Sequence, residues 1–381
     1  MSHWLRSRPA STDAMLAVFD DDATLRHALA FEAALARAEA AEGLVEAEAA
    51  EAIDMLCARI VIDPAELANE AALAGTLAIP LVARLRKDLP EGAAKALHKG
   101  ATSQDLADCV LVQQIRAGHA LLATDLGRIA TALATLARRH AAAPAIGRTL
   151  LQDALPIGFG LRIAQWQAGI VAATERLGRE VESGAVLQFG GAAGTRAGLS
   201  GKADAVSARL ATALGLPDAP PWHARREGIA GIASALAIVI GALGKMARDV
   251  SLLAQNGIGE AREPAVPGRG GSSAMAHKRN PTACQITLSA ATRAPGLAAG
   301  ILAGLTAAEQ ERGLGGWQAE GPALAELFLI VAGAAEAMAG VAEGLEVDEG
   351  AIARNLEQAG LGDDIGESEA LVAALLGDGA R

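Results

Sequence analysis

The sequence of 381 residues contains no tyrosine, and aromatic residues make up only 2% of it. A core with so few rings has to be filled by alanine, leucine, isoleucine and valine, which suits helices packed closely against one another. Apolar residues recur at helical spacing through most of the chain, and no strand-like alternation of any length is present. We therefore predict an all-α fold built around several long helices.

Cysteine and positive charge are also scarce. The three cysteines, Cys57, Cys109 and Cys284, lie far apart and match no metal-binding spacing. Because the N-terminus has no apolar leader, this odd number of cysteines favours a reducing, cytoplasmic location. Lysine and arginine total 33 against 44 aspartates and glutamates, a net charge of −11, which argues against a nucleic-acid partner.

One uncharged run, residues 228–244, is similar in composition to a membrane span. It is slightly shorter than the about 20 residues that a span needs, and an amphipathic sequence continues from Lys245. We predict a helix buried at the centre of a large bundle, with no membrane association. Helices that are apolar on all sides also favour burial against other copies, so we predict a homo-oligomer. Further long helices are predicted at residues 106–140, 160–183, 283–309 and 322–342.

Polar segments interrupt this apolar pattern at residues 98–105 (HKGATSQD), 147–156 (GRTLLQDALP) and 268–281 (GRGGSSAMAHKRNP). The third segment is the richest in glycine, which permits a positive φ and a close approach of backbone N–H groups to an anion. Lys278 adds positive charge to this loop. The loop is typical of one that holds a small anion against the hydroxyl group of Ser272, the alternative being a flexible linker with incidental charges.

These three segments, in this order and at these separations, resemble the active-site segments of the fumarase/aspartase superfamily, over about residues 10–345. Within it, Phe189–Thr195, Pro221–His223 and Gly316–Glu320 look most like bacterial 3-carboxy-cis,cis-muconate cycloisomerases. The resemblance implies a helical homotetramer whose central helices form one core, with each active site built from segments of three subunits. We divide the chain into an N-terminal helical domain (1–105), a central long-helix bundle (106–345) and a short, truncated C-terminal segment (346–381).

The activity that the resemblance implies is lactonisation of a tricarboxylate, 3-carboxy-cis,cis-muconate, to carboxymuconolactone through an aci-carboxylate intermediate. This reaction belongs to the protocatechuate branch of the β-ketoadipate pathway, and neither a metal nor an organic cofactor is implied. Three alternatives stay open. They are a fumarate-releasing lyase of the adenylosuccinate or argininosuccinate type, a cycloisomerase acting on a sulfonated muconate, and a helical oligomer without activity.

By the same resemblance, Ser272 is the catalytic base, and Lys278 and His98 are the other catalytic residues. The candidates for binding substrate carboxylates are Thr102, Ser103, Gln104, Arg148, Thr149, Gln152, Ser273, Arg279 and Asn280. A serine hydroxyl needs N–H donors and a nearby cation to ionise, and we expect Gly270 and Gly271 to supply the N–H groups. As alternatives, the hydroxyl residues of the first segment cap the next helix, the histidine is an ordinary polar residue, and the arginine of the middle segment forms a salt bridge.

Several departures from the superfamily pattern bear on the activity. Leu150 stands where most members have a histidine that helps to protonate a poor leaving group. A carboxylate, with a pKa of about 4, needs no acid to leave and no base to attack, so Leu150 favours lactonisation over amine elimination. Ala276 replaces a usual proline, and Gln310 stands where the cycloisomerases tend to have histidine.

Overall fold

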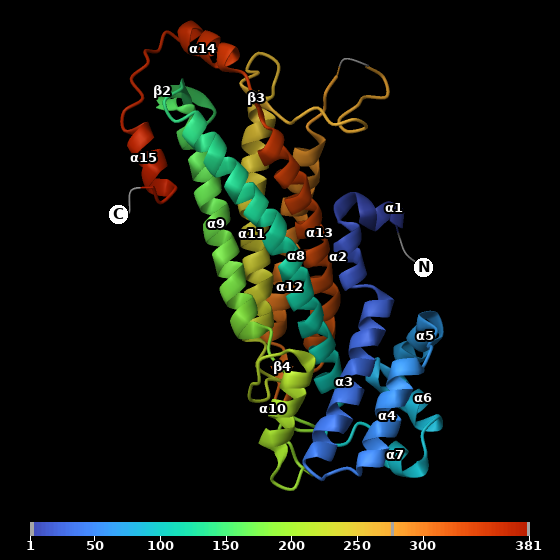
Figure 1. Ribbon diagram of the computed structural model, residues 1–381. Helices are drawn as coiled ribbons and strands as arrows, with labels where there is room; N and C mark the ends of the chain where they lie inside the picture. Colours follow the sequence, from blue (N-terminus) through green and yellow to red (C-terminus); the bar gives the residue numbers. More distant parts are fainter. Residues whose placement is uncertain (1–3, 276–277, 379–381) are drawn as a thin grey trace.

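Five long helices lie side by side and form the central bundle in the computed structural model, which describes residues 4–275 and 278–378 (Figure 1). They are α8 (Ser103–Arg139), α9 (Phe159–Gly184), α11 (Glu227–Leu253), α12 (Thr282–Leu305) and α13 (Gly316–Gly344). Their buried faces are made mostly of alanine, leucine, isoleucine and valine, as the scarcity of aromatic residues predicts. The prediction of an all-α bundle is confirmed.

Helix α8 sets the length of the molecule. It begins directly after Thr102, whose backbone N–H donates a hydrogen bond of 2.9 Å to the carboxylate of Asp105. This bond satisfies one of the N–H groups at the start of the helix. The first segment therefore caps α8, which was the alternative to substrate binding. With 37 residues at 1.5 Å each, α8 is about 55 Å long and joins the two ends of the bundle.

In Figure 1, the N-terminal helices run from beside the middle of the bundle, at α1 and α2, to its lower end. They are α1 (Trp4–Ser7), a 3₁₀ turn (Arg8–Ala10), α2 (Asp13–Val18), α3 (Asp21–Ala41), α4 (Ala47–Arg59), α5 (Pro64–Ala74), α6 (Ala78–Lys87) and α7 (Glu91–Ala96), and α10 (Ala203–Leu214) packs on α3 there. Pro80 lies in the first turn of α6. The first four N–H groups of a helix have no partner within it, so proline costs little there.

Short strand pairs occur at both ends of the bundle, although the sequence showed no strand pattern. At the upper end, β1 (Pro144–Thr149) pairs with β2 (Gln152–Gly158), and β3 (Ala261–Arg262) with β6 (Glu346–Val347). At the lower end, β4 (Ala308–Glu309) pairs with β5 (Arg312–Gly313). The last two helices, α14 (Glu349–Gln358) and α15 (Ser368–Leu375), pack against β1 and α9.

The turn between β1 and β2 explains why this hairpin could not be predicted from the sequence. Its two turn residues, Leu150 and Leu151, both have positive φ angles, 51° and 64°. Such turns normally carry Asn-Gly or Asp-Gly, because bulky side chains are strained in the left-handed region. Both leucines are exposed, Leu150 by 96%, so the strained turn presents apolar side chains to solvent.

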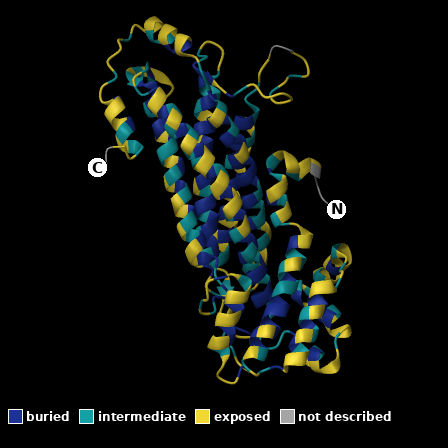
Figure 2. Ribbon diagram, in the orientation of Figure 1, coloured by how far each residue is buried: buried dark blue, intermediate teal, exposed yellow. Residues whose placement is uncertain are grey.

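Burial is uneven among the bundle helices (Figure 2). By length and composition alone, α8, α11, α12 and α13 are each apolar enough to cross a membrane. In the most apolar 18-residue windows, 61% of α11 and 72% of α13 are buried within the protomer, which agrees with the buried helix predicted at residues 228–244. The corresponding windows of α8 and α12 are only 28% buried, so these two helices keep apolar surface that one copy does not cover.

Candidate active site

The three polar segments do not meet within one copy of the chain. The first lies at the lower end of the bundle, where α8 starts, and the other two lie at the upper end (Figure 1). The C-terminal end of α12 lies near the first segment. Arg312, shortly after that helix, donates a hydrogen bond of 3.1 Å to Gln104 of the first segment. The third segment precedes α12, whose 24 residues span about 36 Å. A site that uses all three segments therefore requires more than one copy.

Gln104 faces the protein interior rather than a ligand. Its side chain is buried, its amide nitrogen donates to the carbonyl of His223 at 3.0 Å, and its amide oxygen accepts the bond from Arg312. Both amide groups are thus occupied within the protomer. We assign Gln104 to holding the segment in place rather than, as predicted, to binding substrate. The neighbouring Thr102 and Ser103 are partly exposed and stay candidates for substrate contact.

Asp105 organises the surroundings of the first segment. Its carboxylate accepts hydrogen bonds from the backbone N–H groups of Gly190 and Gly191, each at 2.9 Å, besides that of Thr102. It also lies 2.7 Å from Nε2 of the buried His223. This single carboxylate joins the start of α8 to the glycine-rich loop that precedes α10, a role that the sequence did not reveal.

His98, predicted to be catalytic, is paired with a buried acid of α3. Its Nδ1 lies 2.6 Å from Oε1 of Glu32, whose side chain is fully buried, while 14% of the histidine side chain is exposed. The backbone of His98 is in the left-handed region, with a φ of 61°. Burial by itself lowers the pKa of His98, but the hydrogen bond and negative charge of Glu32, with a smaller contribution from Asp105, raise it above its usual value.

Beneath the first segment, a buried arginine joins three helices. Arg226, just before α11, forms a bidentate pair with Asp108 of α8, with N–O distances of 2.7 and 2.9 Å. The same guanidinium binds the buried Glu320 of α13 and lies 4.5 Å above the ring of Trp222. Trp317 donates its indole N–H to Asp108 at 3.0 Å. None of these residues was predicted to belong to the site.

The middle segment is a hairpin with a paired arginine. Arg148 donates two hydrogen bonds, of 3.0 and 2.7 Å, to the fully buried carboxylate of Glu260. Its charge is therefore neutralised within the protomer, which supports the salt-bridge alternative over substrate binding. Thr149 and Gln152 are exposed on either side of the turn.

In the third segment, Ser272 lies in a tight turn of backbone donors. Its Oγ accepts hydrogen bonds from the N–H groups of Ala274 at 3.3 Å and Met275 at 3.1 Å. We expected the donors to be Gly270 and Gly271, but Ala274 and Met275 supply the N–H groups instead. The effect on the oxygen is the same. N–H groups aimed at the oxygen favour its ionised form.

The rest of this loop is held by Asn280 and Arg279. Asn280 donates its backbone N–H to the carbonyl of Gly270 at 2.8 Å and its side-chain amide to that of Gly271 at 3.1 Å. Arg279 binds the carboxylate of Glu346 and the carbonyl of Glu263, so it closes the base of the loop instead of facing a ligand.

The loop also exposes two candidate anion-binding side chains, and one of the two remaining departures can be placed. Lys278 and Ser273 are exposed, so both are available to an anion. Ala276 lies outside the described residues. Gln310 forms the turn between β4 and β5, with a φ of 50°, two residues from Arg312.

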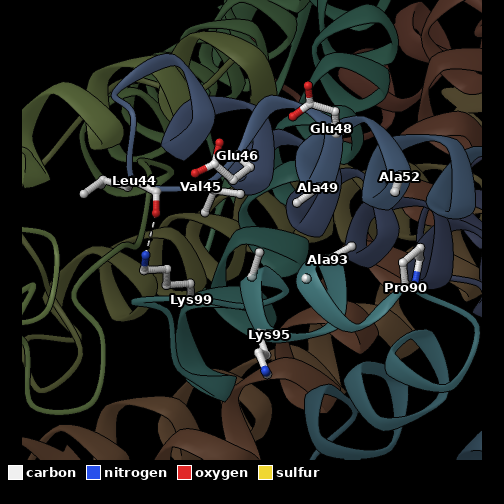
Figure 3. Close-up of a pocket in the computed structure, with 12 residues that line it drawn as sticks. Leu44, Val45, Glu46, Glu48, Ala49, Ala52, Pro90, Ala93, Lys95 and Lys99 are labelled. Carbon is white, nitrogen blue, oxygen red and sulfur yellow. Dashed lines mark hydrogen bonds between the residues drawn. The ribbon is translucent and has the colours of Figure 1, made fainter.

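A pocket of about 580 Å³ opens beside the first segment, between α4 and α7 (Figure 3). Lys99 closes one end of it by donating a hydrogen bond of 2.6 Å to the carbonyl of Leu44. Alanines such as Ala49 and Ala93 line much of the remainder. None of the residues predicted to contact substrate lines this pocket, so we do not place the reaction there.

Comparison with known proteins identifies the class. The lyase family model matches residues 8–296, which is more than half of the chain, so the protein belongs to that family. The chain is 47% identical over 351 residues to 3-carboxy-cis,cis-muconate cycloisomerase of Bradyrhizobium diazoefficiens, an alignment that covers 91% of this chain and 78% of the relative. It is 38% identical over 356 residues to nitrosuccinate lyase of Streptomyces davaonensis, covering 90% and 75%.

A solved structure gives the same result at the level of the fold. The structure of 3-carboxy-cis,cis-muconate lactonizing enzyme from Pseudomonas putida superposes with a TM-score of 0.87 at 40% identity. The match covers 99% of this chain and 88% of the other. The resemblance stated from the three segments is thereby confirmed.

Proposed function

We propose that this protein is a cycloisomerase that converts 3-carboxy-cis,cis-muconate to carboxymuconolactone. One observation carries the choice among the reactions of the family. At the tip of the middle segment, the chain presents Leu150, which is 96% exposed and has no proton to donate, while Ser272, Lys278 and Asn280 are all present in the serine loop. Ring closure by a carboxylate needs no acid at that point, whereas expulsion of an amine does.

The reaction requires one proton and the stabilisation of the negative charge that develops on a substrate carboxylate. A carboxylate oxygen of the substrate bonds to the β-carbon, and the electron pair of the double bond moves to the α-carbon and its carboxylate. Ser272 delivers a proton to the α-carbon, and Lys278 and Asn280 bind the carboxylate on which the charge develops. Each turnover forms one C–O bond and consumes one proton, with no leaving group.

We further propose that the active site is shared between copies in a homotetramer. The distance between the segments within one copy supports this, because α8 and α12 separate them by tens of ångströms. The exposed leucines at the tip of the hairpin support it as well, since apolar side chains on a strained turn are typical of a contact surface. The half-exposed apolar faces of α8 and α12 are suited to the shared core.

A cytoplasmic location, with no membrane or nucleic-acid partner, stays part of the proposal. The free thiols of Cys57, Cys109 and Cys284 and the net charge of −11 support it.

A turnover assay tests the proposal directly. Adding 3-carboxy-cis,cis-muconate should cause loss of the absorbance of the conjugated diene, and the Ser272→Ala variant, checked for normal assembly, should lose this activity. Parallel assays with a sulfonated muconate, adenylosuccinate and nitrosuccinate test the alternatives. Nitrosuccinate is included because nitrite, like a carboxylate, leaves without help from an acid, so Leu150 does not argue against it. Turnover of one of these compounds but not of carboxymuconate would overturn the proposal.

A further inference from the structure

The pair formed by His98 and Glu32 has the geometry of a tuned proton carrier. Glu32 lies against Nδ1 at 2.6 Å, and Nε2 makes no hydrogen bond to any described residue. The left-handed backbone of His98 is costly for a residue with a side chain, and such strain persists only where the surroundings enforce it. The ring of His98 is thus held by Glu32 at Nδ1 and stays partly exposed, in the polar segment that starts α8.

The setting of Glu32 differs from that of an ordinary ion pair. It lies on the buried face of α3, and its second oxygen, Oε2, has no hydrogen-bond partner among the described residues. Glu39, two turns further along the same face, is also fully buried, and neither of its oxygens is paired there. A buried carboxylate without partners is costly. Within the described part of the chain, the side chain of Glu32 makes one hydrogen bond, to His98, and that bond accounts for the presence of Glu32 in a face made mostly of alanine.

We propose that Glu32 is a positioning residue, whose carboxylate holds the proton on Nδ1 of His98 so that Nε2 carries the proton that lactonisation consumes. This proposal rests on the proposed function. Nε2–H of the imidazolium gives its proton to Ser272 of another copy after Ser272 has protonated the α-carbon. His98 is then neutral with its proton still on Nδ1, and it takes one proton from solvent to restore the cycle. The carrier thus occupies a different place from the histidine that Leu150 replaces.

The charges around the ring agree with this role. Glu32 of α3 and Asp105 of α8 favour the charged imidazolium, while Arg86 of α6 and burial oppose it, and the net effect is a raised pKa. Removing the charge of Glu32 leaves the opposing effects in place. Glu39 faces Lys99 and Glu32, and its own pKa is raised by burial to about 8, so Glu39 is mostly neutral at pH 7.

The test uses the full-length protein with Glu32→Gln, and with Glu39→Gln as the matched control on the same buried face. In Glu32→Gln, the pH at which kcat declines on the alkaline side should move down by about one to two units, because a hydrogen bond to a charged partner is lost. At pH 7 this lowers kcat by up to about 10-fold for a shift of one unit and up to about 100-fold for two units, and it leaves KM unchanged, since Glu32 does not contact substrate. The Glu39→Gln control should keep the wild-type profile, and Glu32→Gln should add nothing in a His98→Gln background.

A measurement without turnover separates this inference from the proposed function. Titration of the histidine Cε1–H signals by NMR, with His98 assigned from the His98→Gln variant, should show the same downward shift in Glu32→Gln only. If the wild type does not lactonise carboxymuconate, the proposed function fails, and the titration still tests the pair. An unchanged His98 titration in Glu32→Gln, or a pH profile that Glu39→Gln shifts equally, would show that Glu32 only fills space.

Discussion

Replacing Arg226 with methionine tests how much the free energy of unfolding depends on this one buried cation. Methionine keeps much of the length of the side chain but removes the charge that two buried carboxylates share. Asp108 would keep hydrogen bonds from Trp317 and from Gln188, at 3.0 and 3.2 Å, but Glu320 would have no cationic partner. The variant would therefore bury two like charges close together, with only neutral donors around them.

The expected cost follows from that geometry. Removing one partner of a buried ion pair typically destabilises a protein by about 3–5 kcal/mol, because the remaining charge stays buried. The entropy of unfolding is about 2.1 cal/mol/K per residue, or about 0.8 kcal/mol/K for 381 residues. The midpoint of thermal unfolding should therefore fall by about 4–6 °C, measured by calorimetry at one fixed protein concentration.

The loss should also depend on pH. Burial already raises the pKa of Glu320, and Arg226 opposes this effect, so the variant should have a still higher pKa at Glu320. A group whose folded pKa is raised contributes stability below its unfolded pKa and loses that contribution as the pH rises through the folded pKa. The variant should therefore be closer to the wild type near pH 5 than near pH 8.

Glu320→Gln is the matched control, because it leaves Arg226 with one carboxylate in a neutral pair. It should cost only about 1–2 kcal/mol. Equal losses in the two variants, or a loss in Arg226→Met that is the same at both pH values, would refute the argument that the unbalanced charge causes the damage.

The other predictions concern the serine loop and the contacts between copies. Lys278→Met should lower kcat for carboxymuconate by about 10²- to 10³-fold, measured by diene absorbance, because the developing charge loses its cation; a wild-type kcat would contradict this role. Mixing inactive Ser272→Ala and His98→Gln subunits by unfolding and refolding them together should restore part of the activity, since some sites then combine intact segments, and complete inactivity of the mixture would count against shared sites. Leu150→Asp should reduce the assembly size measured by light scattering while helicity by circular dichroism stays at the wild-type level, and an intact oligomer would show that the hairpin tip is not a contact surface.

The helices could be predicted well because their signal is local. Apolar residues at a spacing of 3.6 predicted α8 within three residues at its start, and Thr102 with Asp105 supplied the capping signal. Helix α13 begins at Gly316, six residues before the predicted start at Pro322, because a proline early in a helix does not define where the helix begins. The hairpin of the middle segment was missed, since Leu150 and Leu151 carry none of the usual turn chemistry.

Only part of the candidate site could be predicted from local sequence patterns. Ser272, Lys278 and His98 lie in segments whose composition stands out against apolar helices. Glu32 was not predicted as a site residue. Its only sequence signal is weak: it is a charged residue on an apolar helical face, with Glu39 two turns later.

By itself, the sequence determined the helical class, the segments that carry the chemistry, and the absence of an acid at Leu150, because each of these is a property of neighbouring residues. The tertiary structure alone decided which charges are free. Arg226 meets Asp108 and Glu320, which lie 118 and 94 residues away from it in the chain, and Gln104 is turned inward by Arg312. It also placed the first segment at the opposite end of the bundle from the other two. Pairing and distance of this kind depend on how rigid helices pack, and no local pattern records them.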